Sequence, residues 1–515
     1  MNGAEALIGT LANAGVDVCF ANPGTSEMQL VAAIDQQPGM RAILGLFEGV
    51  VTGAADGYGR MTDKPAITLL HLGPGLANGL ANLHNAKRAG SPIINLVGDH
   101  ATYHLQYNSP LTSDLEGVAR PMSDWLKVSK SERDLAQIGA EAFSASMSYP
   151  GKITTVVVPA NHAWDEGSAI AEVNAAPAMQ KVPAQAVGDT ATALRDTNGP
   201  IALFLGGRAL REGALEQAGR IATKTGARLL CETFPARLQR GAGRVPVERL
   251  PYFGEQAEEY LKDFKTIVFC GCEPPVSFFA YPGKPSWLSP AGAKLIRLAS
   301  KEEEAEGALQ ALADALDAPA KSALMQESVI PPAPEGTLDP AKIGAILAAA
   351  MPDQAIVVDE AATSGPPIFP ATEGAKQHEW MTVTGGSIGM GLPLATGAAV
   401  ACPDRKVVAL QADGGGMYTC QALWTMAREN LDVTVILLNN GSYAILNIEL
   451  ARVGVQNPGP TALSMLDLHN PALDWVSISH GMGVPAQKAT TVAEFDAALA
   501  EALSHKGPRL IEAMI

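Results

Sequence analysis

Short apolar segments alternate with helix-like segments along the whole of this chain. The runs "DVCFA" (17–21), "PIINLVGD" (92–99) and "DVTVILLNN" (432–440) are strand-like, and helix-like stretches separate such runs from one another. Short strands separated by helices form βαβ units, in which the strands lie parallel within one sheet. The alternation therefore predicts an α/β fold of mostly parallel sheets flanked by helices.

Two stretches without clear periodicity divide this pattern into three blocks. One covers residues 162–185, and the other is the proline-rich segment 322–340. A length of 515 residues, at about 100–200 residues per domain, also suggests roughly three domains. We predict domains over residues 1–165, 183–320 and 337–515, each with its own mostly parallel sheet.

The composition argues against several classes of protein. The net charge is −16 and no run of Lys or Arg occurs, so a nucleic-acid binder is not expected. No apolar run approaches the ~20 residues of a membrane-spanning helix, and the N-terminus lacks the basic segment of a signal peptide. The six cysteines are scattered without a C-x-x-C pair, which favours buried thiols in a reducing compartment. We therefore expect a soluble cytoplasmic protein.

In the third block, a polar residue ends each of two successive strand-like runs. Asp413 follows one run and precedes three glycines, and Asn440 ends the next run, 440 − 413 = 27 positions later. The segment 417–430 between them is expected to be an amphipathic helix. A strand, a helix and a return strand use up this length, so both side chains should lie at the carboxyl edge of one sheet, where α/β sheets bind ligands.

Polar oxygens at such an edge suit Mg²⁺ together with a diphosphate. Carboxylate and amide oxygens are hard ligands, and the glycines Gly414 and Gly415 let phosphate oxygens approach the backbone. A lone Asp-Gly pair is more often an ordinary helix N-cap. The paired strand ends at this spacing favour the ligand site instead.

This pattern resembles the signature of thiamine diphosphate enzymes, a G-D-G followed at a similar spacing by N-N. The resemblance implies that Asp413, Asn440 and the carbonyl of Ser442 hold Mg²⁺. Ala412 stands where the family usually has glycine, a change that removes no ligand. The residues implied beside the cofactor here are Gly414, Gly415 and Tyr443.

The N-terminal block resembles the pyrimidine-binding domain of acetolactate synthases and benzoylformate decarboxylases. The resemblance lies in "ANPGTSEM" (21–28) and "GLFEGVVTGAADGYGR" (45–60), and it assigns the family's glutamate to Glu48. A carboxylate bonded to the pyrimidine N1′ promotes the imino tautomer that activates the thiazolium C2. In the family, this glutamate of one subunit meets the diphosphate site of another. The resemblance thus implies at least a homodimer, with a homotetramer the common state.

Two further segments match the family. The stretch "TVTGGSIGMGLP" (382–393) resembles the segment that bends the cofactor, with Ile388 as the apolar wedge and the Gly386 carbonyl as acceptor of the 4′-amino group. Thr363 lies where relatives contact the diphosphate. His71 resembles the active-site histidine of benzoylformate decarboxylase, and Thr25 stands where that enzyme carries a serine that touches the substrate carboxylate.

The middle block departs from that relative. Its segment "PPVSFFAYPG" (274–283) offers Phe278, Phe279 and Tyr281 where the decarboxylase has a second histidine. With one proton donor fewer, the decarboxylated fragment would live longer and could attack a second carbonyl. We therefore predict decarboxylation of a 2-oxo acid with carboligation, as in acetolactate synthases. Simple decarboxylation of benzoylformate type is the alternative, and a catalytically inactive cofactor-binding relative is the second.

Two points concern other ligands. The middle block has no G-x-G-x-x-G, only the glycine pair in "FLGGRAL" (204–210), so FAD is not expected. His100 and His104 have a spacing that could bind metal on a helix, but no third ligand lies nearby. Local hydrogen bonding or substrate contact is the preferred interpretation, and their role stays open.

Overall fold

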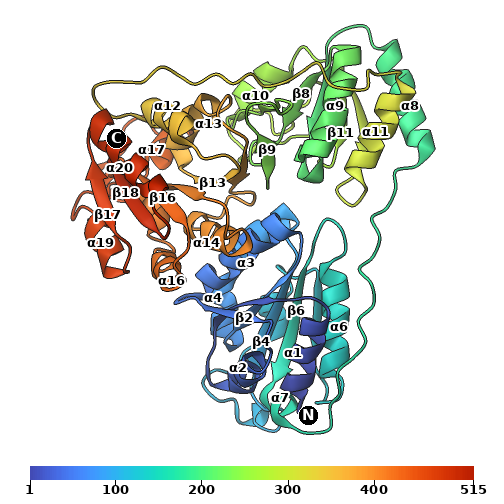
Figure 1. Ribbon diagram of the computed structural model, residues 1–515, viewed down its shortest axis with the longest axis vertical. Coiled ribbons are helices and arrows are strands. Elements are labelled where there is room, and N and C mark those ends of the chain that lie inside the picture. The colour runs from blue at the N-terminus through green and yellow to red at the C-terminus, as the bar shows by residue number, and fades with distance from the viewer.

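The computed structural model describes residues 1–515. It contains three separate sheets, each flanked by helices, with the N-terminal sheet below and the other two above it in Figure 1. All strand pairs but one are parallel within these sheets. The predicted α/β class, with three mostly parallel sheets, is confirmed. The predicted domain boundaries stay predictions.

The N-terminal sheet has six parallel strands between two layers of helices. Its strand order is β2 (Arg41–Leu44), β1 (Val18–Asn22), β3 (Ala66–Leu70), β4 (Ile93–Asp99), β6 (Ile153–Pro159) and β5 (Trp125–Val128). The helices are α1 (Gly3–Asn13), α2 (Met28–Asp35), α3 (Glu48–Thr62), α4 (Leu72–Ala89), α5 (Leu115–Ala119), α6 (Leu135–Ser146) and α7 (Ala160–Trp164). Strands β3, β4 and β6 are buried on both faces, as expected of central parallel strands.

The middle sheet has five parallel strands. Their order is β10 (Glu248–Arg249), β8 (Arg228–Cys231), β7 (Ile201–Leu205), β11 (Thr266–Cys270) and β12 (Lys294–Ala299). The helices are α8 (Ala184–Asp196), α9 (Glu212–Thr225), α10 (Gly254–Leu261) and α11 (Ala305–Ala315). The strand order reverses between β7 and β11, which makes this point the expected ligand crevice of such a sheet.

The C-terminal sheet has seven strands, one of which comes from the middle of the chain. Their order is β17 (Ala486–Ala489), β18 (Arg509–Met514), β16 (Val433–Asn439), β15 (Val407–Ala412), β13 (Ala355–Glu360), β14 (His378–Thr382) and β9 (Leu238–Arg240). The edge strand β9 pairs antiparallel with β14. The sequence pattern predicts neither of these two strands, because both are short and contain charged residues.

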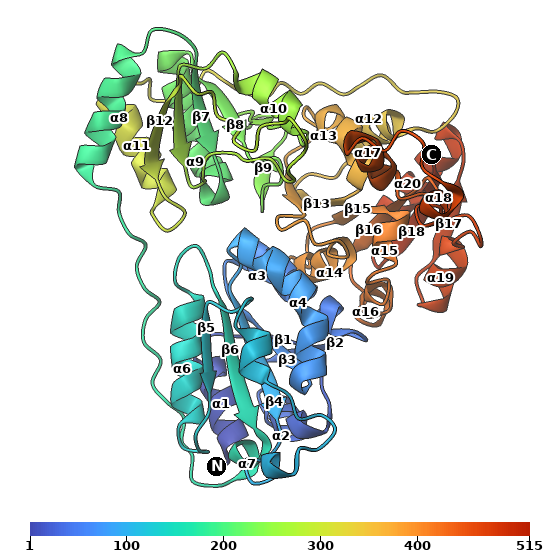
Figure 2. The ribbon, with the colours of Figure 1, turned by 180° about the vertical axis from the view of Figure 1, so that it is seen from behind.

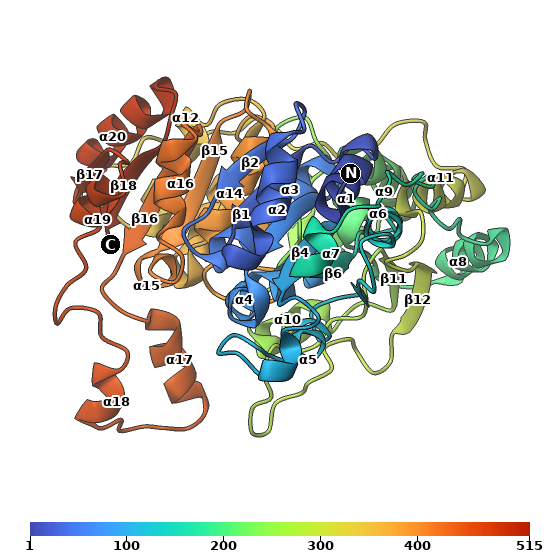
Figure 3. The ribbon, with the colours of Figure 1, turned by 90° about the horizontal axis from the view of Figure 1, so that it is seen from below.

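The helices of this last part are α12 (Pro340–Ala350), α13 (Gly365–Ala371), α14 (Gly391–Ala401), α15 (Asp413–Gly416), α16 (Ala422–Arg428), α17 (Ala444–Arg452), α18 (Pro460–Ser464), α19 (Trp475–Gly481) and α20 (Val492–Ser504). The expected helix over 417–430 is only partly right, because it starts at Ala422 after a series of turns. Helices α17 and α18 stand away from the sheet (Figure 3), and α17 buries none of its residues.

The N-terminal and C-terminal parts meet where α3 packs on α14 (Figure 2). Two glycines permit the close approach of these helices. A Cβ atom at Gly57 would collide with the Leu394 carbonyl, and one at Gly397 would collide with the Ala54 carbonyl. This packing fixes α3, which begins at Glu48, against the helix that follows the loop 383–390.

All three parts of the chain meet at the C-terminal end of α3. Arg60 forms a buried ion pair with Asp56 (2.6 Å) and donates to the Thr382 carbonyl at the end of β14 (2.8 Å). Arg237 of the middle part donates to the carbonyls of Arg60 (2.9 Å) and Met61 (3.1 Å). Cationic side chains at a helix C-terminus interact favourably with its dipole. Helix α3 is therefore anchored to both the middle and the C-terminal parts of the chain.

The six cysteines are free, and five are buried, as the sequence predicts. None of the helices combines the length and the apolar composition that crossing a bilayer requires.

Candidate functional site

Asp413 and Asn440 meet at the carboxyl edge of the C-terminal sheet, as their spacing predicts. Strands β15 and β16 pair in parallel up to Ala412 opposite Leu438. The backbone N–H of Gly441 then donates to Asp413 Oδ2 (2.9 Å). The left-handed backbone of Gly441 (φ 61°) makes this turn possible.

The rest of the predicted metal-binding set lies in the same turn. The N–H of Ser442 donates to Asn440 Oδ1 (3.0 Å), and the Ser442 hydroxyl donates to the Leu466 carbonyl (3.1 Å). Asn439 has a different task, because its amide donates to the buried Glu512 carboxylate (2.8 Å). The turn thus places Asn440 and Ser442 next to Asp413, which follows the neighbouring strand.

The surroundings of Asp413 suit a bound cation. The residue is 2% exposed, and none of the ion pairs in the chain involves it. Burial raises the pKa of its carboxyl above the usual value, although the amides of Gly414 and Gly441 oppose the shift. A buried carboxylate without a cationic partner is costly. A hard divalent cation such as Mg²⁺ fits the carboxylate and amide oxygens here.

The glycines beside Asp413 are pressed against neighbouring side chains. A Cβ atom at Gly414 would collide with the ring of Tyr443, and one at Gly415 would lie 3.4 Å from Cγ2 of Ile388. The turn, Tyr443 and the predicted apolar wedge are therefore adjacent. Thr363, half-buried in the short 3₁₀ helix after β13 (Ala362–Ser364), lies at this same edge.

The loop 383–390 between β14 and α14 carries the predicted wedge. Ile388 is 40% exposed, and the space around Gly386 (φ 72°) is open. Beneath this loop lies Glu360, a residue that the sequence pattern does not single out. Its carboxylate accepts the N–H groups of Gly389 (2.7 Å) and Met390 (3.0 Å). Burial raises the pKa of Glu360, and these hydrogen bonds oppose the shift.

A second group of predicted residues lies at the carboxyl edge of the N-terminal sheet. Glu48 begins α3, and its Oε2 accepts a hydrogen bond from the Asn78 amide (2.9 Å). His71 lies between β3 and α4. A Cβ atom at Gly75 would lie 2.9 Å from Glu48 Oε1 and 3.3 Å from His71 Cβ. The carboxylate and the imidazole therefore flank the same glycine.

Glu27, which sequence analysis did not single out, supports His71. It is completely buried, and its Oε2 lies 2.8 Å from His71 Nδ1 and accepts the Gly24 N–H (2.7 Å). The only sequence signal for Glu27 is its place within the motif that contains Thr25. Thr25 itself is exposed at the start of a short 3₁₀ helix (Thr25–Glu27).

No hydrogen bond or ion pair links Glu48 or His71 to the turn at Asp413. The glycines after His71 lie inside α4, which begins at Leu72.

His100 and His104 do not lie on a helix. Their rings are 5.4 Å apart in the loop after β4, and His100 Nε2 lies 3.0 Å from the Ser109 hydroxyl. No cluster of three His, Cys, Asp or Glu side chains suited to a metal occurs. Local hydrogen bonding accounts for His100.

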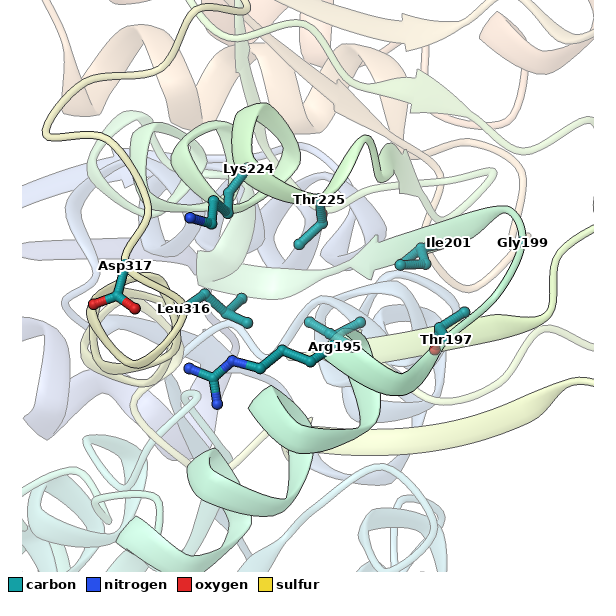
Figure 4. Close-up of a pocket in the computed structure, with 9 residues that line it drawn as sticks. Arg195, Thr197, Gly199, Ile201, Lys224, Thr225, Leu316 and Asp317 are labelled. Carbon is teal, nitrogen blue, oxygen red and sulfur yellow. The ribbon is translucent and has the colours of Figure 1, made fainter.

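A cavity of about 290 Å³ lies away from both edges, in the middle part of the chain (Figure 4). It opens near the amino end of β7, where Arg195, Lys224 and Asp317 border it. None of the predicted site residues lines it.

Comparison with known proteins places both edges in one family. The N-terminal TPP binding domain of thiamine pyrophosphate enzymes matches residues 1–119, and the C-terminal TPP binding domain matches residues 370–513. The chain is 50% identical over 522 residues to a Mycobacterium tuberculosis protein named provisionally as the acetolactate synthase large subunit IlvX, covering 100% of this chain and 99% of that one.

Two further relatives cover nearly the whole chain. Benzoylformate decarboxylase of Pseudomonas aeruginosa is 28% identical over 528 residues, covering 97% of this chain and 96% of its own. The solved structure of a thiamine diphosphate-dependent 4-hydroxybenzoylformate decarboxylase from Rhodococcus jostii RHA1 shares the fold, with a TM-score of 0.88, 24% identity and coverage of 99% and 98%. The chain therefore belongs to the thiamine pyrophosphate enzyme family, in the group of acetolactate synthases and benzoylformate decarboxylases.

Proposed function

We propose that the protein uses thiamine diphosphate and Mg²⁺ to decarboxylate a 2-oxo acid and joins the remaining fragment to a second carbonyl compound. The observation that carries this proposal is the pair of complementary edges. The C-terminal edge holds the buried carboxylate of Asp413, which forms no ion pair, in a turn rich in oxygen ligands. The N-terminal edge holds Glu48 beside His71. When bound, the cofactor supplies an electron sink for the electron pair left by CO₂.

Asp413, Asn440 and the Ser442 carbonyl would hold Mg²⁺, and Gly414, Gly415, Tyr443 and Thr363 would border the diphosphate. Glu48 would hold a proton at N1′ of the pyrimidine, and Asn78 would orient its carboxylate by the hydrogen bond to Oε2 (2.9 Å). The Gly386 carbonyl would accept the 4′-amino group, with Ile388 packed against the rings.

His71 would move a proton at the substrate. Glu27 accepts the Gly24 N–H at the same oxygen that faces His71 Nδ1, so this oxygen acts as an acceptor. This arrangement favours the proton on Nδ1 and leaves Nε2 to exchange a proton with substrate. Thr25, exposed at the same edge, would contact the substrate carboxylate.

The middle part of the chain favours ligation over simple decarboxylation. Its loop 274–283 carries the exposed rings of Phe278 and Phe279, and the Tyr281 hydroxyl donates to Glu449 of α17 (2.5 Å). Helix α17 follows the turn at Ser442, so this loop borders the proposed site with aromatic surface and no second histidine. The relative with 50% identity, which carries an acetolactate synthase name, supports the same choice.

Simple decarboxylation is the second candidate. The His71–Glu27 pair provides one route for protonation of the fragment, and the 28% identical relative is named benzoylformate decarboxylase. An inactive cofactor-binding protein is disfavoured by Glu48, since cofactor binding alone does not need that carboxylate.

A flavin is not part of this proposal. The expected ligand crevice of the middle sheet lies between β7 and β11, where Gly206 and Gly271 meet. A Cβ atom at Gly206 would lie 2.6 Å from Cys272 Cβ, and one at Gly271 would lie 2.5 Å from the Gly206 carbonyl oxygen. The turns after β7 and β11 therefore pack directly against each other at this point.

A product assay tests the proposal. The purified protein, given thiamine diphosphate and Mg²⁺, is incubated with pyruvate or benzoylformate, and both CO₂ and organic products are measured. We expect CO₂ together with a 2-hydroxy ketone or acetolactate-type product. If an aldehyde is the sole organic product, the reaction is simple decarboxylation and not ligation. If no 2-oxo acid of a broad panel releases CO₂, both proposed reactions are contradicted.

A further inference from the structure

The loop 383–390 is bound to helix α4 by one completely buried side chain, Asn85. Its Oδ1 accepts the N–H groups of Gly385 (3.2 Å) and Ser387 (3.1 Å), and its Nδ2 donates to the Ser387 carbonyl (2.7 Å). An amide side chain is suited to this task because it both accepts and donates. One residue thereby fixes the backbone on both sides of Gly386.

Neighbouring residues of α4 extend this contact. His84 Nε2 lies 3.1 Å from the Gly385 carbonyl oxygen, and the Asn82 amide donates to the Gly389 carbonyl (3.3 Å). The Thr384 hydroxyl donates to the Asn85 carbonyl (2.7 Å). The face of α4 that carries these residues therefore binds the loop along its length.

From the opposite side, Glu360 accepts the N–H groups of Gly389, Met390 and Gly391. Within the loop, the residues held from α4 are thus 384, 385, 387 and 389. The carbonyl of Gly386 accepts no hydrogen bond from the chain, and the Ile388 side chain is 40% exposed. The held positions therefore flank Gly386 and Ile388, in a loop whose backbone turns at Gly386 (φ 72°) and Gly389 (φ 100°).

We propose that Asn85 is a positioning residue: it holds the loop so that the Gly386 carbonyl and Ile388 face the bound thiamine diphosphate. The inference rests on the proposed function for the roles of Gly386 and Ile388. It adds a residue of the N-terminal part that acts on the C-terminal half of the site within the same chain.

Helix α4 also contacts the N-terminal edge of the site. His71 precedes the first residue of α4, and Asn78 of α4 donates to Glu48. Helix α4 therefore connects the proposed proton-transfer residues with the loop that would orient the cofactor. Loss of the Asn85 amide leaves the two partly buried N–H groups of Gly385 and Ser387 without their partner, so the loop is expected to shift or loosen.

The test compares Asn85→Ala with Arg88→Ala, a variant on the same helix whose exposed side chain takes part in no hydrogen bond or ion pair. Three quantities are measured on the full-length protein: the Kd for thiamine diphosphate with Mg²⁺, the near-ultraviolet circular dichroism of the bound cofactor, and kcat. We expect Asn85→Ala to lower kcat at least about tenfold and to alter the dichroism, while Kd changes less than about threefold. Arg88→Ala should match the wild type in all three.

A second variant keeps the test decisive if Asn85→Ala folds poorly. In Asn85→Asp, the protonated acid can accept the two N–H groups and still donate to the Ser387 carbonyl, whereas the ionised form cannot donate. The ratio of its kcat to the wild-type kcat should therefore rise as the pH falls. A ratio that stays flat with pH would contradict the proposal.

Other outcomes overturn it as well. Unchanged kcat and dichroism in Asn85→Ala, or complete loss of cofactor binding, would show that Asn85 does not act by orienting the bound cofactor. The failure of the proposed function is a separate result. In that case the wild type releases no CO₂ from 2-oxo acids, yet Kd and dichroism still report whether Asn85 shapes the cofactor site.

Discussion

The two edges that make up the candidate site are built in different ways. At the C-terminal edge, the side chains of Asp413 and Asn440 accept hydrogen bonds from the backbone N–H groups of Gly441 and Ser442 in one turn. At the N-terminal edge, Glu48 and His71 are held by side chains from other elements, Asn78 and Glu27. A metal site built from backbone tolerates little change of main-chain shape, whereas a proton-transfer site held by side chains can be tuned one residue at a time.

The largest effect is expected at the N-terminal edge. Glu48→Gln should lower kcat by about 10²–10⁴-fold, the usual contribution of a general acid or base. The Kd for the cofactor should change only a few-fold, because the turn at Asp413 is intact. Equal losses in kcat and in cofactor binding would show that Glu48 belongs to the binding set.

A mixing experiment tests whether the two edges of one site come from different subunits. Glu48→Gln and Asp413→Ala are each expected to be inactive alone. After co-refolding or co-expression, mixed dimers would contain one intact site, so activity should recover to about a quarter of the wild-type value. No recovery, despite mixed dimers shown by mass spectrometry, would place both edges of a site in a single chain.

Glu27→Gln tests whether the Glu27 carboxylate supports proton transfer by His71. We expect kcat to fall about tenfold with a smaller change in KM, because the amide cannot stabilise a charged imidazole as the carboxylate does. Glu116→Gln, at an exposed position on α5, serves as the matched control. A larger effect on KM than on kcat would assign Glu27 to substrate binding.

Gly414→Ala tests the backbone-built edge. Its Cβ atom would collide with the ring of Tyr443, so the turn or the ring has to move. Displacements of this kind cost roughly 1–3 kcal/mol, and we expect about tenfold weaker binding of thiamine diphosphate and Mg²⁺ in a titration. Gly481→Ala, with open space around the new Cβ atom, should bind normally.

The smallest effect concerns stability. Burial raises the pKa of Asp413 in the folded state, so the folded protein binds the proton more tightly than the unfolded chain, and stability falls as the pH rises through the folded pKa. In the metal-free protein at neutral pH, Asp413→Asn should therefore raise Tm by roughly 1–3 °C. The gain should vanish at acid pH. With Mg²⁺ and cofactor present, the wild type should be the more stable protein.

The two edges also differ in how well the sequence predicts them. The spacing of Asp413 and Asn440 fits one βαβ crossover, so geometry alone places them together. Glu27, Glu360 and Asn85 follow no such pattern. Each is a buried polar side chain with a partner that only the folded chain brings near: His71 for Glu27, and the backbone of loop 383–390 for Glu360 and Asn85. The short strands β9 and β14 were missed for a similar reason, because tertiary pairing and not local composition makes them strands.

Strand β9 has a consequence for how the chain can be assembled or recombined. It lies in the middle of the sequence but forms the edge of the C-terminal sheet, paired with β14. During synthesis, β9 leaves the ribosome long before its partner strand exists, so it must wait unpaired until the C-terminal sheet folds. An exchange of the middle part with that of a relative would replace an edge strand of the neighbouring sheet as well. Chimeras should keep residues 238–240 together with the C-terminal part.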